Sequence, residues 1–418
     1  MFRRNWNCAT LYSRLVNFSS SSSSSLHNFT HLRSSFSSSS SPNLHLTPSV
    51  AASKSTDLLS LVRHYGNCYS ELSKARLSLL VVATSGTGFV LGSGGAVDLS
   101  VLSYTCLGTM MVAASASTLN QVFEVKNDAI MKRTNRRPLP SGRITIPHAV
   151  GWASSVGLAG TALLATQTNM LAAGLAASNL ILYSFVYTPL KQIHPVNTWV
   201  GAVVGAIPPL LGWAAASGDI SLNSLILPAA LYFWQIPHFM ALAYLCRDDY
   251  AAGGFKMYSL ADTSGRKTAV VALRNSIYLI PLGFLAYDWG VTSGWFCLES
   301  TALTLAISAA AFSFYRDRTK ERARRMFHAS LLYLPIFMAG LLIHRRTDDQ
   351  QFSEVNADGF VKSSSSVESS SSVESSDTHD KNGNQKIKGR QGNRARSPVA
   401  YASCAPFPFL PLPDEIFD

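Results

Sequence analysis

Residues 99–143 read LSVLSYTCLGTMMVAASASTLNQVFEVKNDAIMKRTNRRPLPSGR, and two patterns in this stretch decide the fold. The first part, 99–118, contains no charged side chain. Its length matches the roughly 20 residues that an α-helix needs to cross a bilayer. The second part, 119–143, is rich in Lys and Arg. The stretch therefore predicts a membrane helix followed by a basic loop, and this pair of patterns recurs along the chain.

Nine apolar stretches of this kind occur in the middle of the chain, and each is close to the length that spans a membrane. They lie at 78–97, 99–118, 147–165, 170–187, 198–216, 223–245, 269–288, 294–315 and 327–344. The 418-residue chain is 47% hydrophobic and only 14% charged, whereas soluble proteins carry about 25% charged residues. We therefore predict an all-α membrane protein with about nine transmembrane helices.

The basic residues are concentrated in alternate loops. With nine spans, the loops that share the side of the N-terminus, here called side A, are 119–146, 188–197, 246–268 and 316–326. The loops on the opposite side, side B, contain no Lys or Arg, except that Arg345 and Arg346 follow the last span. This is the positive-inside pattern of membrane proteins. It explains the net charge of +11 without a nucleic-acid partner.

The two ends of the chain differ in composition from the middle. Residues 1–52 contain Arg and runs of Ser but no Asp or Glu, which is typical of an organelle transit peptide. Arg and apolar residues at helical spacing favour the mitochondrion, although composition alone leaves the plastid open. Residues 346–418 are Ser-rich with a Pro-rich end, which predicts a disordered tail. Between the ends we predict a side-A segment before the first span at 53–77 and a nine-helix domain at 78–345.

The first candidate site follows the second span. Asn120, Glu124 and Asp128 are four residues apart, so they lie on one helical face if that helix continues to Asp128. Two carboxylates and an amide are ligands that suit Mg²⁺, which is often shared with substrate phosphates. The basic residues that follow are Lys132, Arg133, Arg136 and Arg137. Such cations beside Mg²⁺ would bind a diphosphate. The alternative is that these charges merely balance each other at the membrane surface.

The second candidate site, RDDYAAGGFKM at 247–257, lies in another side-A loop. Ionisable residues at the edge of a membrane are functional candidates by default. An acidic group here, opposite the first candidate site, would hold a diphosphate from its other side. Two acidic sites on one membrane face are a stronger signal than either site alone.

At these two sites the sequence resembles the UbiA-type intramembrane prenyltransferases. The segment NQVFE…ND…MKRTNRRPLPSGRI (120–144) resembles their first motif, N-x-x-x-D-x-x-x-D, with Glu124 in place of the middle Asp. Within that family, the heme O synthases (protoheme IX farnesyltransferases) are the most similar group. Four further segments, at 187–213, 233–244, 247–257 and 330–335, carry this resemblance. It covers about 75–345 in collinear order.

The resemblance implies a fold in which the helices surround a central cavity, and a Mg²⁺-dependent transfer of farnesyl from farnesyl diphosphate to a vinyl group of heme B. It implies that Asn120, Glu124, Asp128 and Asp249 are the metal-binding and catalytic residues. Lys132, Arg133, Arg136, Arg137 and Lys191 would bind the diphosphate. Water would complete the addition and give heme O for heme A and cytochrome oxidase assembly. The implied setting is the mitochondrial inner membrane, with side A facing the matrix, heme A synthesis partners and a homo-oligomer.

Two histidines in spans, His238 and His328, are candidates for contacting the heme iron or propionates. His238 is as readily explained by a hydrogen bond between helices. Tyr183 and Tyr187 would shield a carbocation with their rings, or simply pack.

The sequence leaves two alternatives open. One is a UbiA-type enzyme that prenylates a quinone precursor or a chlorin. The other is a polytopic transporter or assembly protein, for which charges near the bilayer midplane would be expected. The charges instead gather on side A, which favours diphosphate chemistry.

Overall fold

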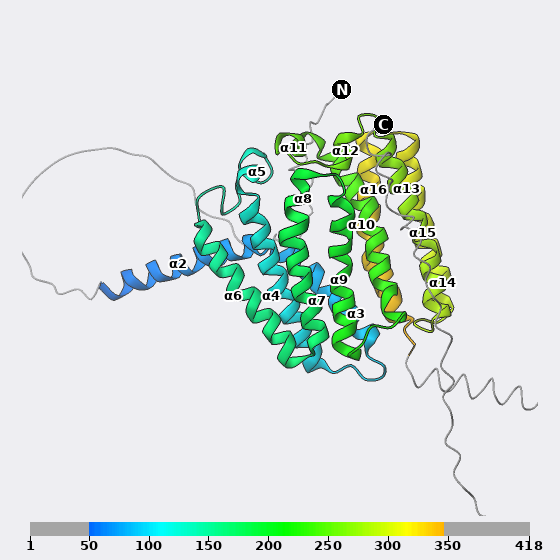
Figure 1. Ribbon diagram of the computed structural model, residues 1–418, viewed down its shortest axis with the longest axis horizontal. Helices are drawn as coiled ribbons and strands as arrows, with labels where there is room; N and C mark the ends of the chain where they lie inside the picture. The colour runs from blue at the N-terminus through cyan, green and yellow to red at the C-terminus, as the bar shows by residue number, and fades with distance from the viewer. Residues whose placement is uncertain (1–49, 347–418) are drawn as a thin grey trace, which may run out of the picture. The chain divides into compact units, whose positions relative to one another are not determined.

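The computed structural model describes residues 50–346, and every regular element in this part of the chain is a helix, with no β-strand (Figure 1). Nine segments in it are long and apolar enough to cross a membrane. They are α3 (Ala75–Gly92), α4 (Leu99–Phe123), α6 (Ile146–Gln167), Met170–Ile193, α9 (Asn197–Ser217), Asn223–Leu245, Arg266–Asp288, α15 (Trp295–Arg316) and α16 (Lys320–Ile343). The predicted number of spans and their order are therefore confirmed.

Three of the nine spans are composite. Their parts are α7 (Met170–Ile181), the π-helix η1 (Leu182–Tyr187), α8 (Thr188–Ile193), the 3₁₀ turn η2 (Asn223–Leu225), α10 (Ile226–Leu245), α13 (Arg266–Ile277) and α14 (Ile280–Asp288). The helices outside the spans are α2 (Val50–Leu72), α5 (Val125–Ile130), α11 (Arg247–Ala252) and α12 (Tyr258–Ala261). Most of the segment expected to precede the first span thus forms α2. The predictions for residues 1–49 and 347–418 lie outside the described residues.

The helices α9 and α10 lie between two groups of spans. On one side, α9 packs against α3 and α7, and α4 packs against α3 and α6. On the other side, α10 packs against α13 and α16, and α15 packs against both of these. Buried apolar side chains fill both groups. The bundle therefore has its hydrophobic interior on both sides of the α9–α10 pair.

Two glycines bring α3 and α9 into backbone contact. A Cβ on Gly88 would overlap the carbonyl of Pro209, and a Cβ on Gly212 would overlap the carbonyl of Ser85. Small residues at such crossings allow membrane helices to approach closely. These contacts fix the first span of the bundle against its centre.

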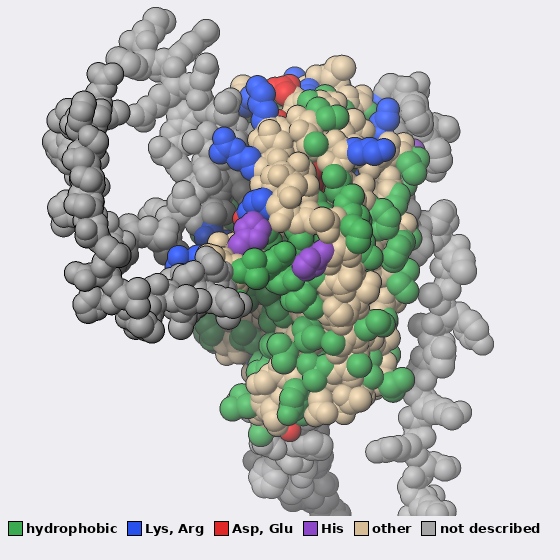
Figure 2. Space-filling model, turned by 90° about the vertical axis from the view of Figure 1, so that its left-hand side faces the viewer, with side chains coloured by type: hydrophobic (Ala, Val, Ile, Leu, Met, Phe, Trp, Pro, Cys, Tyr) green, Lys and Arg blue, Asp and Glu red, His purple; other side chains and the backbone are tan. Residues whose placement is uncertain are grey.

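The polar elements gather at one end of the bundle. Helices α5, α8, α11 and α12 lie there together (Figure 1). In Figure 2, Lys and Arg side chains concentrate toward the same end, and hydrophobic side chains cover the surface below. This end contains the side-A loops of the positive-inside pattern. At side B, the exceptional Arg345 donates hydrogen bonds to the carbonyls of Ser93 and Gly95, so its charge has partners within the bundle.

Candidate functional site

Three segments that are far apart in the sequence meet at side A. The Asn127 amide after α4 donates a hydrogen bond to the Gly253 carbonyl after α11, with Nδ2–O at 2.8 Å. The backbone N–H of Lys256 donates to the Lys191 carbonyl in α8 over 2.7 Å. The two candidate sites predicted from the sequence therefore lie side by side, joined through α8.

The chain continues with helical hydrogen bonding past the end of α4. The N–H of Glu124 donates to the Asn120 carbonyl over 3.1 Å, and that of Asp128 donates to the Glu124 carbonyl over 2.8 Å. Glu124 interrupts the helix only locally, between α4 and α5. The side chains of Asn120, Glu124 and Asp128 remain buried, at 1%, 4% and 0% exposure. The condition for placing them on one face is thus met, although Asp128 belongs to a separate short helix.

Each of these three side chains contacts a cation from a different part of the chain. Lys74 Nζ donates to Asn120 Oδ1 over 2.7 Å. Lys191 forms an ion pair with Glu124. Arg137 lies 2.6 Å from Asp128 Oδ2, whereas Asp128 Oδ1 is buried with no hydrogen-bond partner. The result is a compact patch of oxygen ligands and cations, in which Asp128 Oδ1 has neither a hydrogen-bond nor an ion-pair partner among the described residues.

Lys74 was not predicted, because nothing in its local sequence marks it as more than a basic residue before a span. It links α2 to α3 and has φ 45° and ψ 50°, the one positive φ among the described non-glycine residues. Burial and the neighbouring Arg137 and Lys191 lower the pKa of Lys74 to about 7. A non-glycine residue held in the left-handed region is strained, and such strain clusters at functional sites.

The remaining predicted basic residues lie at the edge of this patch. Arg133 stacks over the Tyr250 ring at 5.9 Å, which connects the first candidate site to α11. Lys132 and Arg136 are exposed and form no ion pair with the described residues. The structure therefore brings Arg137 and Lys191 into the patch, places Arg133 beside it and leaves Lys132 and Arg136 in solvent.

The two acidic residues of the second candidate site have different surroundings. Asp248 is exposed and lies 3.6 Å from Lys320. Asp249 is half-buried on α11, beside Tyr250. Within residues 50–346, no three His, Cys, Asp or Glu side chains are close enough to form a complete metal site by themselves. Any metal bound here would therefore need the Asn120 oxygen or ligands from a substrate.

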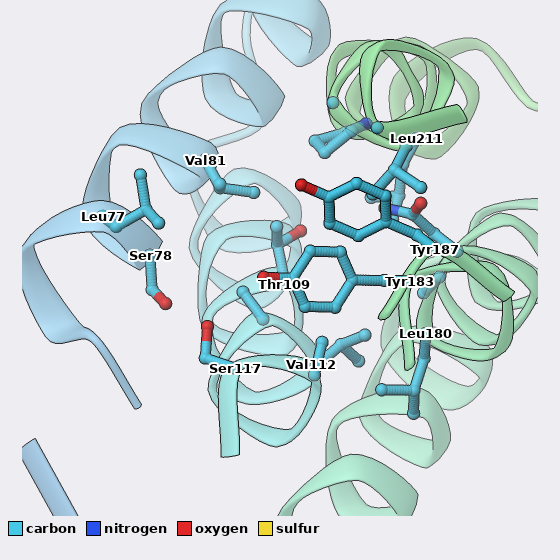
Figure 3. Close-up of a pocket in the computed structure, with 18 of the residues that line it drawn as sticks. Leu77, Ser78, Val81, Thr109, Val112, Ser117, Leu180, Tyr183, Tyr187 and Leu211 are labelled. Atoms are coloured by element: carbon cyan, nitrogen blue, oxygen red, sulfur yellow. The ribbon is translucent and has the colours of Figure 1, made fainter. Parts of the chain in front are cut away.

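An apolar cavity of about 280 Å³ lies below the patch, between α3, α4, α7, α9 and α10. The rings of Tyr183 and Tyr187 project into it from the π-helix η1 (Figure 3). Lys191 Nζ lies 4.9 Å from the centre of the Tyr187 ring. Because π-helical turns change the direction of side chains and recur at functional sites, η1 connects the charged patch to the cavity.

The two candidate histidines, and His194 in the basic loop 188–197, have different surroundings. The His238 ring stacks between Trp234 and Phe327, with ring centres at 5.2 and 4.7 Å. Its Nδ1 is 2.8 Å from Ser330 Oγ on α16, which is the inter-helix hydrogen bond that the sequence left open. His328 is exposed, and His194 accepts a hydrogen bond from the Val196 N–H at a turn.

Comparison with known proteins adds to this geometry. The profile of the UbiA prenyltransferase family matches residues 79–338. The chain is 64% identical over 368 residues to "Protoheme IX farnesyltransferase, mitochondrial" of Arabidopsis thaliana, covering 88% of this chain and 81% of that protein. It is 39% identical over 277 residues to the human protein of the same name, covering 66% of this chain and 62% of the human one.

Solved structures show the same fold at low sequence identity. A digeranylgeranylglyceryl phosphate synthase matches 66% of this chain and 97% of its own, with a TM-score of 0.58 and 17% identity. A UbiA homolog from Archaeoglobus fulgidus bound to DMAPP and Mg²⁺ matches 65% of this chain and 98% of its own, with a TM-score of 0.50 and 16% identity. The predicted helical fold around a central cavity is thereby confirmed.

Proposed function

This chain belongs to the UbiA prenyltransferase family, and we infer that it transfers the farnesyl group of farnesyl diphosphate to a vinyl group of heme B, giving heme O. The main support for this reaction type is the buried patch of Asn120, Glu124 and Asp128 with three cations, which lies next to an apolar cavity. The acceptor follows from the relatives named protoheme IX farnesyltransferase. This acceptor displaces the quinone, chlorin and transporter alternatives.

The charged patch fits a divalent metal ion shared with a diphosphate. Asp128 Oδ1 is a buried carboxylate oxygen without a partner, and Asn120 and Glu124 offer further oxygens on the same face. Hard oxygen ligands of this kind suit Mg²⁺. We propose that Asn120, Glu124, Asp128 and Asp249 hold the metal, which neutralises charge on the leaving diphosphate. The Mg²⁺ bound to the Archaeoglobus homolog together with DMAPP supports this choice.

The cations of the patch stabilise the leaving group when the allylic C–O bond breaks. Lys191 and Arg137, with Lys74, are already held within the buried site by their oxygen partners. They therefore need little rearrangement as negative charge develops, and fixed charges of this kind are usually the largest contribution to catalysis. Arg133 lies at the edge of the patch and would close over the diphosphate. The exposed Lys132 and Arg136 would guide it in from solvent.

The cavity below the patch suits the farnesyl chain. Its lining is mainly aliphatic and aromatic, for example Leu77, Val81 and Leu211 (Figure 3). A diphosphate at Lys191 would place the first carbon of the chain beside the Tyr187 ring, since Lys191 lies directly over that ring. The electron-rich ring face would stabilise the allylic cation. We therefore assign Tyr183 and Tyr187 to the reacting end of the chain.

His238 is the proposed contact for the heme iron. Its Nδ1 is engaged by Ser330 and its ring is held between two aromatic side chains, which leaves Nε2 as the ligating atom. A hydrogen bond on the other ring nitrogen is the usual way in which ligating histidines are oriented. His328, which is exposed on α16, would contact heme at the lipid-facing side.

The chain is a mitochondrial multi-pass membrane protein, as its relatives are named and as its nine spans require. We propose that it resides in the inner membrane with side A facing the matrix, because the basic loops gather there. We also propose that the protein self-associates into a homo-oligomer. A partner enzyme would convert its product, heme O, to heme A.

The function is tested by heme analysis of cells that lack their own heme O synthase. The full chain and its Asp128→Asn variant are expressed, and extracted hemes are separated by chromatography with mass detection. We expect heme O from the first and none from the second. A folded, membrane-inserted wild-type chain that makes no heme O would overturn the acceptor assignment. Heme O from both would remove Asp128 from the catalytic residues.

A further inference from the structure

Formation of heme O requires a water molecule in addition to the two large substrates, and the following inference rests on the proposed function. Once farnesyl joins the vinyl group, the resulting cation must be captured by water to give the hydroxyl of the product. The cavity under the charged patch is mostly apolar. A reactive water therefore needs a defined polar site within it, because buried waters are held by two to four polar partners.

Gln235 provides one such partner. It lies on α10, lines the cavity and is 7% exposed. Its Nε2 donates to the carbonyls of Leu231 and Ala202, over 3.0 and 3.4 Å. These two bonds orient the amide and leave Oε1 as an acceptor with no partner in the described part of the chain. The amide lies directly against Gly205, where any Cβ would overlap it.

The neighbouring helix provides further acceptors at the same level. Pro208 and Pro209 lie inside α9, and proline has no N–H to donate to the carbonyl four residues earlier. The carbonyls of Val204 and Gly205 therefore lose their helical partners, and both residues line the cavity. In membrane helices, carbonyls freed in this way are commonly satisfied by ordered water.

The Gln235 amide and the freed carbonyls of α9 lie close to the position proposed for the first carbon of the farnesyl chain. The Tyr187 ring packs on Gly201 in the same way that the Gln235 amide packs on Gly205. These glycines are four residues apart on α9, or about 6 Å along its axis. The order along the cavity wall is thus Lys191, the Tyr187 ring and then the Gln235 amide, so that a water at Gln235 lies about one helical turn beyond the Tyr187 ring.

We propose that Gln235 Oε1, together with the freed carbonyls of α9, binds the water that hydroxylates the farnesylated heme. As the C–O bond to diphosphate breaks, its electron pair leaves with the diphosphate, and farnesyl C1 bonds to the terminal vinyl carbon. The other vinyl carbon becomes cationic. The oxygen of the water bound at Gln235 forms the new C–O bond, and its proton passes to the released diphosphate.

Another interpretation is that Gln235 only joins α10 to α9. The two interpretations predict different products. If water is not held in place, the cation loses a proton instead and gives an anhydro product, a farnesylated heme lighter by one water. A purely structural role would change the amount of product and the stability of the protein, but not the ratio of hydroxylated to anhydro product.

The test measures that ratio by mass-resolved chromatography in the full chain, with incorporation from ¹⁸O-labelled water as a second readout. For Gln235→Met, which keeps the side-chain length without the amide, we expect the ratio to fall about tenfold, the factor for one hydrogen bond of ordinary strength. Gly205→Ala should lower it as well, because a Cβ there displaces the amide. If Gln235→Met does not fold, the product ratio of Gly205→Ala tests the proposal.

Asn179 supplies the matched control. It lines the same cavity and has a buried Oδ1 without a partner, but it is eight residues before Tyr187, or about 12 Å along the helix. Asn179→Leu should keep the wild-type ratio, whatever its effect on rate. A wild-type ratio in both Gln235→Met and Gly205→Ala, or an equal fall in Asn179→Leu, would overturn the inference. Absence of any farnesylated heme from the wild type would instead overturn the proposed function.

Discussion

Replacing Lys74 separates its backbone strain from its charge. Lys74 adopts φ 45° and ψ 50° and donates to Asn120. Both Lys74→Ala and Lys74→Gly remove the ammonium group, but only glycine adopts this conformation without strain. The left-handed conformation costs a non-glycine residue roughly 1–2 kcal/mol. The unfolded state of the glycine variant has more conformational entropy, and this offsets about 0.4–1 kcal/mol of the stability gained by relieving the strain.

The net expectation is that Lys74→Gly is more stable than Lys74→Ala by about 1 kcal/mol. For a chain of this size, that difference corresponds to roughly 2 °C in Tm, measured by thermal unfolding in one detergent. Both variants should raise the KM for farnesyl diphosphate about tenfold, because each removes the ammonium group that we propose donates a charge-assisted hydrogen bond to the diphosphate. Lys74→Arg should recover part of that loss.

The exposed Arg76, two residues later, supplies a charge-matched control, and Arg76→Ala should keep the wild-type KM. Equal or greater stability of Lys74→Ala than of Lys74→Gly would refute the left-handed conformation. An unchanged KM in both Lys74 variants would refute the role in diphosphate binding.

Four further outcomes follow from the same structure. Glu124→Gln leaves Lys191 buried without its carboxylate, so kcat/KM for farnesyl diphosphate should fall at least about 100-fold in a steady-state assay; a change below threefold would contradict this. Chelation of divalent metal should abolish farnesyl transfer and added Mg²⁺ should restore it, whereas full activity in metal-free buffer would remove the metal from the proposal. His238→Ala should weaken heme B binding about tenfold in an absorption titration, the effect of losing one ligand contact; an unchanged affinity would show that His238 only packs. Gly212→Ala should lower the unfolding free energy by about 1–3 kcal/mol, because a new Cβ pushes α3 from α9, and a wild-type Tm would contradict that backbone contact.

Hydropathy predicts the spans well because each depends on local composition. Hydropathy predicts the ends of the helices less accurately, because helical hydrogen bonding continues beyond the apolar residues. Thus α16 begins at Lys320 rather than near 327, within a basic segment, and α4 continues to Phe123. The first span instead ends early, at Gly92, where the glycine-rich loop 93–98 follows.

The candidate site was predictable only where its residues repeat locally. The four-residue spacing of Asn120, Glu124 and Asp128 predicts that they lie together, and all three side chains are buried. Lys74 reaches Asn120 across 46 residues of sequence, and no local pattern encodes such a contact. Gln235 is equally hidden, because its environment depends on a glycine and two prolines in another helix. The π-helix η1 also has no simple sequence signal, although it directs both tyrosines into the cavity.

The diphosphate-binding groups that we propose all lie at one end of the bundle, which would give the reaction a direction. Farnesyl diphosphate carries its charge at one terminus, so it is captured from a single leaflet with its tail pointing inward. The released diphosphate leaves to the aqueous compartment on that same side. The farnesylated heme is more apolar than its precursor and remains in the bilayer. The fold thus releases the diphosphate to water and keeps the farnesylated heme in the membrane.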